Sequence, residues 1–201
     1  MEEAKAPFLT YEDVNTKAHE TLLACDWNGE IPVDVEAIAE FRLGMDIVPI
    51  RGLMDDFSVD GYLTRDLTQI VVDEYVLERH PTRYRFTLAH ELGHRILHAD
   101  AFSSLHIATT DDWKAFYIGL DEQDYGWFER HAYWFAGALL VPDEILVEEY
   151  ESARSKLQSH GLADSDLSYY SRSQMAGALA KRFLVSTGVM QRRLVEVGVQ
   201  P

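Results

Sequence analysis

The chain of 201 residues is poor in cysteine and in bases. Its one cysteine, Cys25, excludes an intramolecular disulfide, which is typical of proteins from a reducing compartment. Only 18 lysine and arginine residues stand against 34 aspartate and glutamate residues, and the formal net charge is −16. An acidic surface repels phosphate, so we do not expect direct binding to nucleic acid.

Long apolar runs are also missing. The longest, YWFAGALLV at residues 133–141, is too short to cross a bilayer, and we expect no membrane association. The N-terminal segment MEEAKAPFLTYED is acidic and lacks the apolar core of a secretory signal, so a cytoplasmic location is predicted. The 47% hydrophobic content is sufficient for a packed core of one domain.

Hydrophobic periodicity predicts helices around a few short strands in the first part of the chain. One helix is predicted at residues 10–26, with Thr10 and Asp13 as a capping box, and another at residues 32–43. Segments rich in β-branched residues predict strands. These strands lie at residues 45–50, 58–64 and 68–74. The pattern favours an α+β fold, in which a small antiparallel or mixed sheet of about three strands packs on helices.

The second part of the chain is predicted to be helical. A long helix begins at Pro81 and runs to about His98. Further helices are predicted at residues 112–120, 127–141 and 143–160, and as a pair within 173–198. Ser, Asp and Gly cluster at residues 161–173, which indicates a linker. We therefore expect one domain over residues 1–160 and a C-terminal helical appendage over residues 161–201.

The chemical signal of the chain is HELGH at residues 90–94. His90 and His94 lie one helical turn apart, with about 6 Å between their Cβ atoms, so both rings can reach one zinc at about 2.0–2.1 Å. Glu91 is rotated by about 100° from His90, a poor position for a ligand but a good one for reaching water on the metal. The alternative is a solvated polar face on an amphipathic helix.

A catalytic zinc needs a third protein ligand. His98 lies about 12 Å of helix axis from His90, too far for one ion to be reached from both ends. Asp100 is a further candidate, but Leu97 occupies a position where some metallopeptidases need glycine. Glu129, on the next strong helix, can approach from a second element. On spacing alone, a ligand role for Glu129 and simple stabilisation of a helix start are equally consistent.

The chain resembles the ImmA/IrrE-type metallopeptidases, bacterial and phage proteins that combine a minimal zinc-peptidase fold with regulatory roles. The resemblance rests on RYRFTLAHELGHRILH at residues 83–98 and ERHAYWFAGALLVP at residues 129–142. It extends from about Ile31 to Pro142, and LAKRFLVSTGVMQRRLVEVG near the C-terminus resembles the helical pair that often follows.

The resemblance implies a zincin-like fold, a Zn²⁺ cofactor and the roles of several residues. His90, His94 and Glu129 would be the metal ligands, and Glu91 the catalytic acid and base. The implied substrate is a specific protein, such as a helix-turn-helix transcriptional repressor. Tyr133 stands where the family usually has asparagine, which affects how substrate backbone is held.

Other residues near the motifs are candidates for supporting roles. Tyr133 and His131 are candidate oxyanion stabilisers, and His98 is a candidate to support a ligand from behind. The favoured alternatives are a packed aromatic residue for Tyr133 and a surface histidine for His131, and a purely structural role is the alternative for His98. Asp73 lies near the end of the last predicted strand, at a position where the resembled family often has asparagine.

The C-terminal segment differs in charge from the rest of the chain. Its bases, against Glu196 alone, are Arg172, Lys181, Arg182, Arg192 and Arg193. A helix-turn-helix is one interpretation, and a helical pair packed on the peptidase domain is the other. Three function classes follow: a zinc endopeptidase of regulatory type, a DNA-binding or metal-sensing regulator, and a non-cleaving interaction module of a toxin–antitoxin type.

Overall fold

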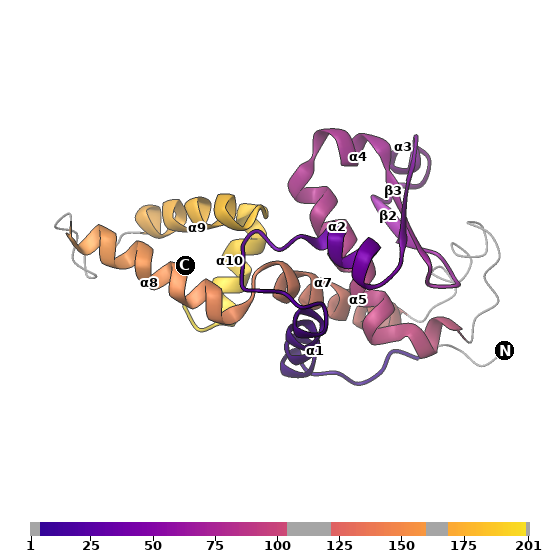
Figure 1. Ribbon diagram of the computed structural model, residues 1–201, viewed down its shortest axis with the longest axis horizontal. Coiled ribbons are helices and arrows are strands. Elements are labelled where there is room, and N and C mark those ends of the chain that lie inside the picture. The colour runs from indigo at the N-terminus through magenta and orange to yellow at the C-terminus, as the bar shows by residue number, and fades with distance from the viewer. Residues whose placement is uncertain (1–4, 104–121, 160–168, 200–201) are drawn as a thin grey trace.

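The structure is a computed structural model that describes residues 5–103, 122–159 and 169–199 (Figure 1). It has a mostly helical α+β architecture with one three-stranded sheet and a run of helices toward the C-terminus. This confirms the fold class predicted from the sequence. No helix in the described ranges is both long enough and apolar enough to span a membrane.

The sheet is mixed and has the order β1–β3–β2. Strand β1 (Asp46–Ile50) runs parallel to β3 (Gln69–Asp73), and β2 (Gly61–Leu63) runs antiparallel to β3. Four of the five residues of β3 are buried, as expected for a central strand that is covered on both faces. Strand β2 is shorter than the predicted segment 58–64 and forms one edge of the sheet.

The N-terminal helix α1 (Tyr11–Ala24) begins as predicted. The Thr10 side chain accepts a hydrogen bond from the Asp13 backbone N–H, and the Asp13 carboxylate accepts one from the Thr10 backbone N–H. The next helix starts later than expected and is irregular: α2 (Val35–Ala37) continues as a π-helical turn, η1 (Ile38–Arg42). It starts later because Asp34 is its N-cap, with a side chain that accepts a hydrogen bond from the Ala37 N–H.

Two short helices flank the sheet, α3 (Leu53–Phe57) and α4 (Glu74–Arg79), and periodicity did not predict either. Asp73 organises both. Its carboxylate accepts hydrogen bonds from the backbone N–H of Val76 at 3.1 Å and of Met54 at 3.0 Å. Burial raises the pKa of Asp73, but these and neighbouring backbone hydrogen bonds lower it more, so it stays below the usual value. A carboxylate can therefore occupy this buried position.

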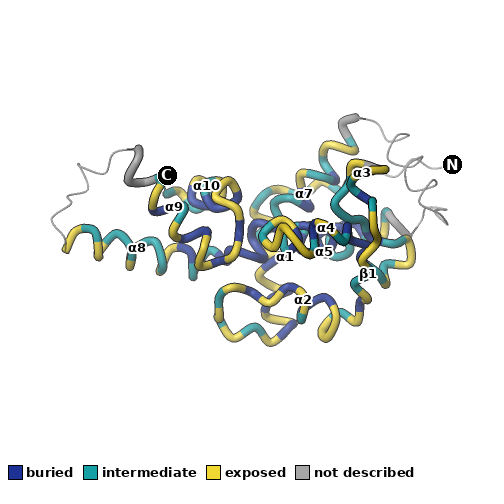
Figure 2. Tube along the Cα trace, turned by 90° about the horizontal axis from the view of Figure 1, so that it is seen from above, coloured by how far each residue is buried: buried dark blue, intermediate teal, exposed yellow. Residues whose placement is uncertain are grey.

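The centre of the molecule is the crossing of α5 (Pro81–Ser103) and α7 (Glu122–Leu140) (Figure 1). Helix α1 packs on α7. Buried residues concentrate where these helices meet, whereas α8 is largely exposed (Figure 2). The predicted helix at residues 112–120 lies outside the described residues.

The chain ends in three helices, α8 (Asp143–Ser159), α9 (Tyr169–Phe183) and α10 (Thr187–Glu196). Ser186 caps α10 by accepting a hydrogen bond from the Val189 N–H at 3.2 Å. The core of α9 and α10 is continuous with that of the preceding helices. The predicted domain boundary at residues 160 and 161 lies outside the described residues.

Candidate metal centre

Helix α5 carries four of the predicted site residues, His90, Glu91, His94 and His98. Its apolar residues Leu88, Ala89 and Leu92 are 0% exposed and fix the helix against the core. His90 and His94 follow one turn apart, as the motif predicts. The helix is therefore held by its apolar side, and its imidazoles face α7 and a cleft.

The two helices approach closely at Gly93. A Cβ atom at this position would lie 3.0 Å from the Cα of Ala132 and 3.2 Å from the Cβ of Phe135. Ala132 and Ala136 are themselves small and fully buried. Small residues on both helices let the backbones come close, and this brings Glu129, one turn before Ala132, to the histidines.

Gly93→Ala is therefore expected to weaken the site and the fold together. The added methyl group forces α7 to move by a few tenths of an ångström, with a loss of about 1–3 kcal/mol in the free energy of unfolding. The same shift moves Glu129 away from the imidazoles and lowers metal affinity. Chemical denaturation and a metal-binding titration measure the two effects.

Gly126→Ala is the matched control, because a Cβ atom there has no atom within 4 Å and Gly126 also lies in a helix, α7. The free energy of unfolding of this variant should rise by up to about 1 kcal/mol from helix propensity alone. A Gly93→Ala variant that gains stability as Gly126→Ala does would contradict the close approach.

Glu129 completes a three-residue group. Its Oε2 lies 3.3 Å from His90 Nε2, its Oε1 lies 3.5 Å from His94 Nε2, and the two Nε2 atoms are 3.1 Å apart. Glu129 is also about two turns beyond the first residue of α7, Glu122. Stabilisation of a helix start acts only within the first turn, so the helix dipole does not account for a glutamate at this position.

The geometry of this group fits a zinc ion. Two atoms that bind one tetrahedral zinc at about 2.0–2.1 Å lie about 3.3 Å apart. The two Nε2 atoms are 3.1 Å apart, each Nε2 lies 3.3–3.5 Å from one of the two Glu129 oxygens, and one ligand atom from each residue can be chosen so that all lie within 4.8 Å of one another. Nitrogen and carboxylate oxygen are ligands that zinc accepts. Within the described ranges, His90, His94 and Glu129 are the residues whose ligand atoms lie close enough together to hold a metal ion.

Charge at the group is concentrated on Glu129. Burial raises the pKa of its carboxyl, but hydrogen bonds and positive charge from His90 and His94 lower it more, so the net pKa is well below the usual range. Burial likewise lowers the pKa of His90, and Glu129 together with the charge of Glu91 raises it more. The Glu129 carboxyl is therefore held in its ionised form, which is the form that binds a metal.

Glu91 lies behind the two histidines and is 7% exposed. Burial is the main influence on its carboxyl and raises the pKa. The backbone N–H of Leu63, in β2, donates a hydrogen bond to the carboxylate. The edge strand therefore orients the carboxylate, and its raised pKa favours proton exchange with water or substrate.

One cleft, with a volume of about 320 Å³, is lined by His90, Glu91, His94 and Glu129. The sheet, α5 and α7 form its walls. Tyr133 lies on the α7 wall, with its ring 4.8 Å from Phe86 and the Arg192 guanidinium 4.3 Å over its face. Tyr133 therefore lines the cleft, and Arg192 connects α10 to this side chain.

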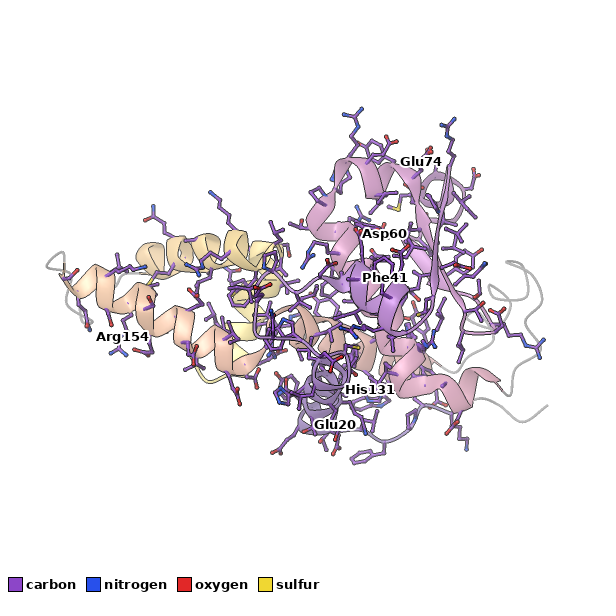
Figure 3. All side chains as sticks on the ribbon, in the orientation of Figure 1. Glu20, Phe41, Asp60, Glu74, His131 and Arg154 are labelled. Carbon is purple, nitrogen blue, oxygen red and sulfur yellow. The ribbon has the colours of Figure 1, made fainter. Side chains whose placement is uncertain are left out.

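The remaining predicted residues lie away from this cleft. Asp100 is exposed on the last turns of α5. His98 and His131 are buried, at 1% and 0% exposure, and neither lines the cleft. In Figure 3, Asp60 lies toward α4, whereas His131 lies toward α1. The pKa of His98 is lowered to about 2, mainly by burial and further by the neighbouring imidazoles.

Several cleft residues were not identified from the sequence. Arg83 and Phe86 precede His90 by seven and four positions on α5, a helical spacing that could have indicated them. Asp60 forms an ion pair with Arg83 across the cleft, and its Oδ1 is buried with no hydrogen-bond partner among the described residues. Asp60 comes from a distant part of the chain and left no local signal.

A solved structure, described as a Mycobacterium tuberculosis transcriptional regulator, is similar in fold, with a TM-score of 0.55 and 16% sequence identity. The alignment covers 91% of this chain but only 46% of that one, so this chain spans less than half the length of the regulator. At this identity the likeness shows the fold alone. No curated protein matches the chain.

The family comparison covers most of the chain. Residues 44–195 match the IrrE N-terminal-like domain of peptidase family M78. The match includes α5, α7 and the cleft between them, together with the C-terminal helices. A metal-binding group of two histidines and a glutamate is consistent with a metallopeptidase. The chain belongs to this family, the ImmA/IrrE metallopeptidases.

Proposed function

We propose that the chain is a zinc-dependent endopeptidase of regulatory type, which cleaves a specific protein such as a helix-turn-helix transcriptional repressor. The observation that carries the proposal is the convergence of His90 Nε2, His94 Nε2 and the Glu129 carboxylate at 3.1–3.5 Å, beside a buried glutamate in a cleft. That arrangement fits an open zinc site with three protein ligands.

The bound zinc would supply Lewis-acid chemistry, which activates water and polarises the scissile carbonyl. Glu91 accepts the proton of the attacking water and passes it to the leaving amine. Its burial supports this role, because a raised pKa brings the carboxyl closer to the pH at which it must both take and give a proton. Tyr133, on the opposite wall, is the candidate donor to the developing oxyanion.

An extended substrate would pair with strand β2. The Thr64 N–H donates to Gln69, and the Asp60 carbonyl accepts from Asp73, so these alternate residues bond toward β3. Gly61 therefore turns its backbone groups to the other edge, and Gly61 also lines the cleft. A peptide added at this edge is held by main-chain hydrogen bonds beside the proposed ligands.

The DNA-binding alternative has less support. Arg193 is buried in ion pairs with Asp143 and Glu196, and Arg182 pairs with Glu149 at 2.6 Å. Arg192 stacks on Tyr133. These bases are engaged with the protein's own groups, and the net charge of −16 opposes approach to phosphate.

Removal of the third ligand tests the metal site. Glu129→Ala is expected to lower bound zinc from one per chain to well below one, because two histidines alone hold zinc poorly. Asp100→Ala, on an exposed acid outside the cleft, should retain the parent's zinc. Metal analysis after gel filtration gives the ratio, and circular dichroism checks that the helices persist. Full zinc retention by Glu129→Ala would contradict the ligand role.

The substrate class needs a separate experiment. The zinc-loaded chain would be incubated with a helix-turn-helix repressor encoded beside its gene, and cleavage followed by mass spectrometry of the products. A discrete cut that is blocked by a chelator is the expected result. Binding of the repressor without any cut would favour the non-cleaving interaction module.

A further inference from the structure

Four imidazoles form a continuous row that leads from the proposed metal site into the interior. His94 Nδ1 lies 3.1 Å from His98 Nδ1, and His98 Nε2 lies 3.4 Å from His131 Nδ1. At the other end, His94 Nε2 lies 3.1 Å from His90 Nε2. His98 and His131 do not line the cleft, so the proposed mechanism leaves both without a role.

The surroundings of the inner rings are apolar and aromatic. Phe128 packs edge-on against His98 with ring centroids 4.8 Å apart, and Trp127 lies 5.6 Å from His131. Such surroundings favour the neutral imidazole, which has one N–H donor and one acceptor nitrogen. Each contact from His94 inward can therefore be a hydrogen bond only if one ring donates and the next accepts.

The metal site determines which ring donates and which ring accepts at each contact of the row. His94 turns Nε2 toward Glu129, so the lone pair that would bind a metal is on Nε2 and the proton is on Nδ1. That proton is donated to Nδ1 of His98. His98 then carries its own proton on Nε2 and donates to Nδ1 of His131.

The inner rings are polar groups buried in apolar surroundings. His131 Nε2 is a buried atom, and the Leu9 backbone lies within hydrogen-bonding reach of the ring. A polar ring costs more to bury at such a position than an apolar side chain such as Phe135, which fills the same helix interface.

We propose that His98 and His131 are positioning residues for the metal site. His98 accepts the Nδ1 proton of His94, and His131 accepts the Nε2 proton of His98. Together they fix the tautomer and the ring orientation of His94 and make its Nε2 a better ligand. This inference rests on the proposed role of His94 as a ligand.

The test compares variants that keep or remove the acceptor. In His98→Asn the side-chain oxygen replaces Nδ1 as acceptor, whereas His98→Leu has a similar branched shape and no acceptor. The zinc dissociation constant of the full chain, measured by competition with a chelator, is expected to rise about 10–100-fold in His98→Leu. His98→Asn should restore most of this affinity. His131→Leu should also raise the zinc dissociation constant, by a smaller factor. His131→Asn should restore the affinity that His131→Leu loses.

Two further measurements separate positioning from packing. Thermal unfolding of the metal-free proteins reports packing: variants that lower the midpoint but keep the parent's zinc affinity would overturn the inference. Long-range ¹H–¹⁵N spectra of the zinc-loaded parent report the tautomer, and they do not depend on any variant folding. The expected result is a proton on His98 Nε2. A proton on His98 Nδ1 would overturn the proposal.

The outcomes also distinguish this inference from the proposed function. A parent chain that binds zinc, with His98→Leu and His131→Leu of equal affinity, would overturn the positioning role and leave the metal site in place. A parent chain that binds no zinc would overturn both.

Discussion

Replacement of Glu91 with glutamine is expected to remove peptidase activity and keep the metal. Glutamine preserves the shape of the side chain, but its amide cannot accept the proton of the attacking water. Loss of a general base costs on the order of 10²–10⁴-fold in rate. Since the proposed ligands are His90, His94 and Glu129, zinc content should stay at one per chain. Turnover of the cleaved protein and metal analysis of the same preparation measure the two quantities.

Glu148→Gln is the matched control, because it removes one glutamate charge from an exposed position on α8, outside the cleft. It should cleave at the parent rate. A Glu91→Gln variant that also cleaves at the parent rate would show that Glu91 is not the base. A variant that loses zinc together with activity would instead place Glu91 among the ligands.

Replacement of Arg193 is expected to give the largest loss of stability. Arg193 is 1% exposed, donates to the Val141 carbonyl from Nε at 3.3 Å and from Nη2 at 3.0 Å, and forms ion pairs with Asp143 and Glu196. It also donates to the hydroxyl of Tyr11, whose pKa is raised to about 12, mainly by burial. One side chain thus joins α1, the start of α8 and α10.

Arg193→Met keeps the aliphatic volume and removes every donor. Breaking a buried ion pair by removing one partner costs about 3–5 kcal/mol, because the remaining groups are left without compensation. Asp143 is 39% exposed and can regain water, so the lower part of that range is expected. Urea denaturation gives the change in the free energy of unfolding.

Arg182→Met is the comparison for this prediction. Arg182 is 54% exposed and pairs with Glu149, and an ion pair of this kind contributes about 0–1 kcal/mol. Equal losses in the two variants would contradict the anchoring role of Arg193. Proteolysis should cut Arg193→Met faster near α9 and α10, since the link from these helices to α1 is lost.

The sequence alone identified the parts of the site that are local in the chain. HELGH places His90, Glu91 and His94 by helix geometry, because residues four apart share a face whatever surrounds them. Helix starts that carry short-range signals could also be predicted from the sequence, as the capping box of Thr10 and Asp13 shows. The helices α3 and α4 were missed because each is too short for periodicity to detect.

The tertiary structure decided which distant groups meet these residues. On spacing alone, Glu129 was as consistent with a helix start as with a ligand, and only the close crossing of α5 and α7 at Gly93 brings its carboxylate to 3.3 Å from His90 Nε2. The contact between His98 and His131 depends on the same crossing. The local pattern of a helix specifies which side chains share a face, but the packing of small residues between two helices sets the distance between those faces.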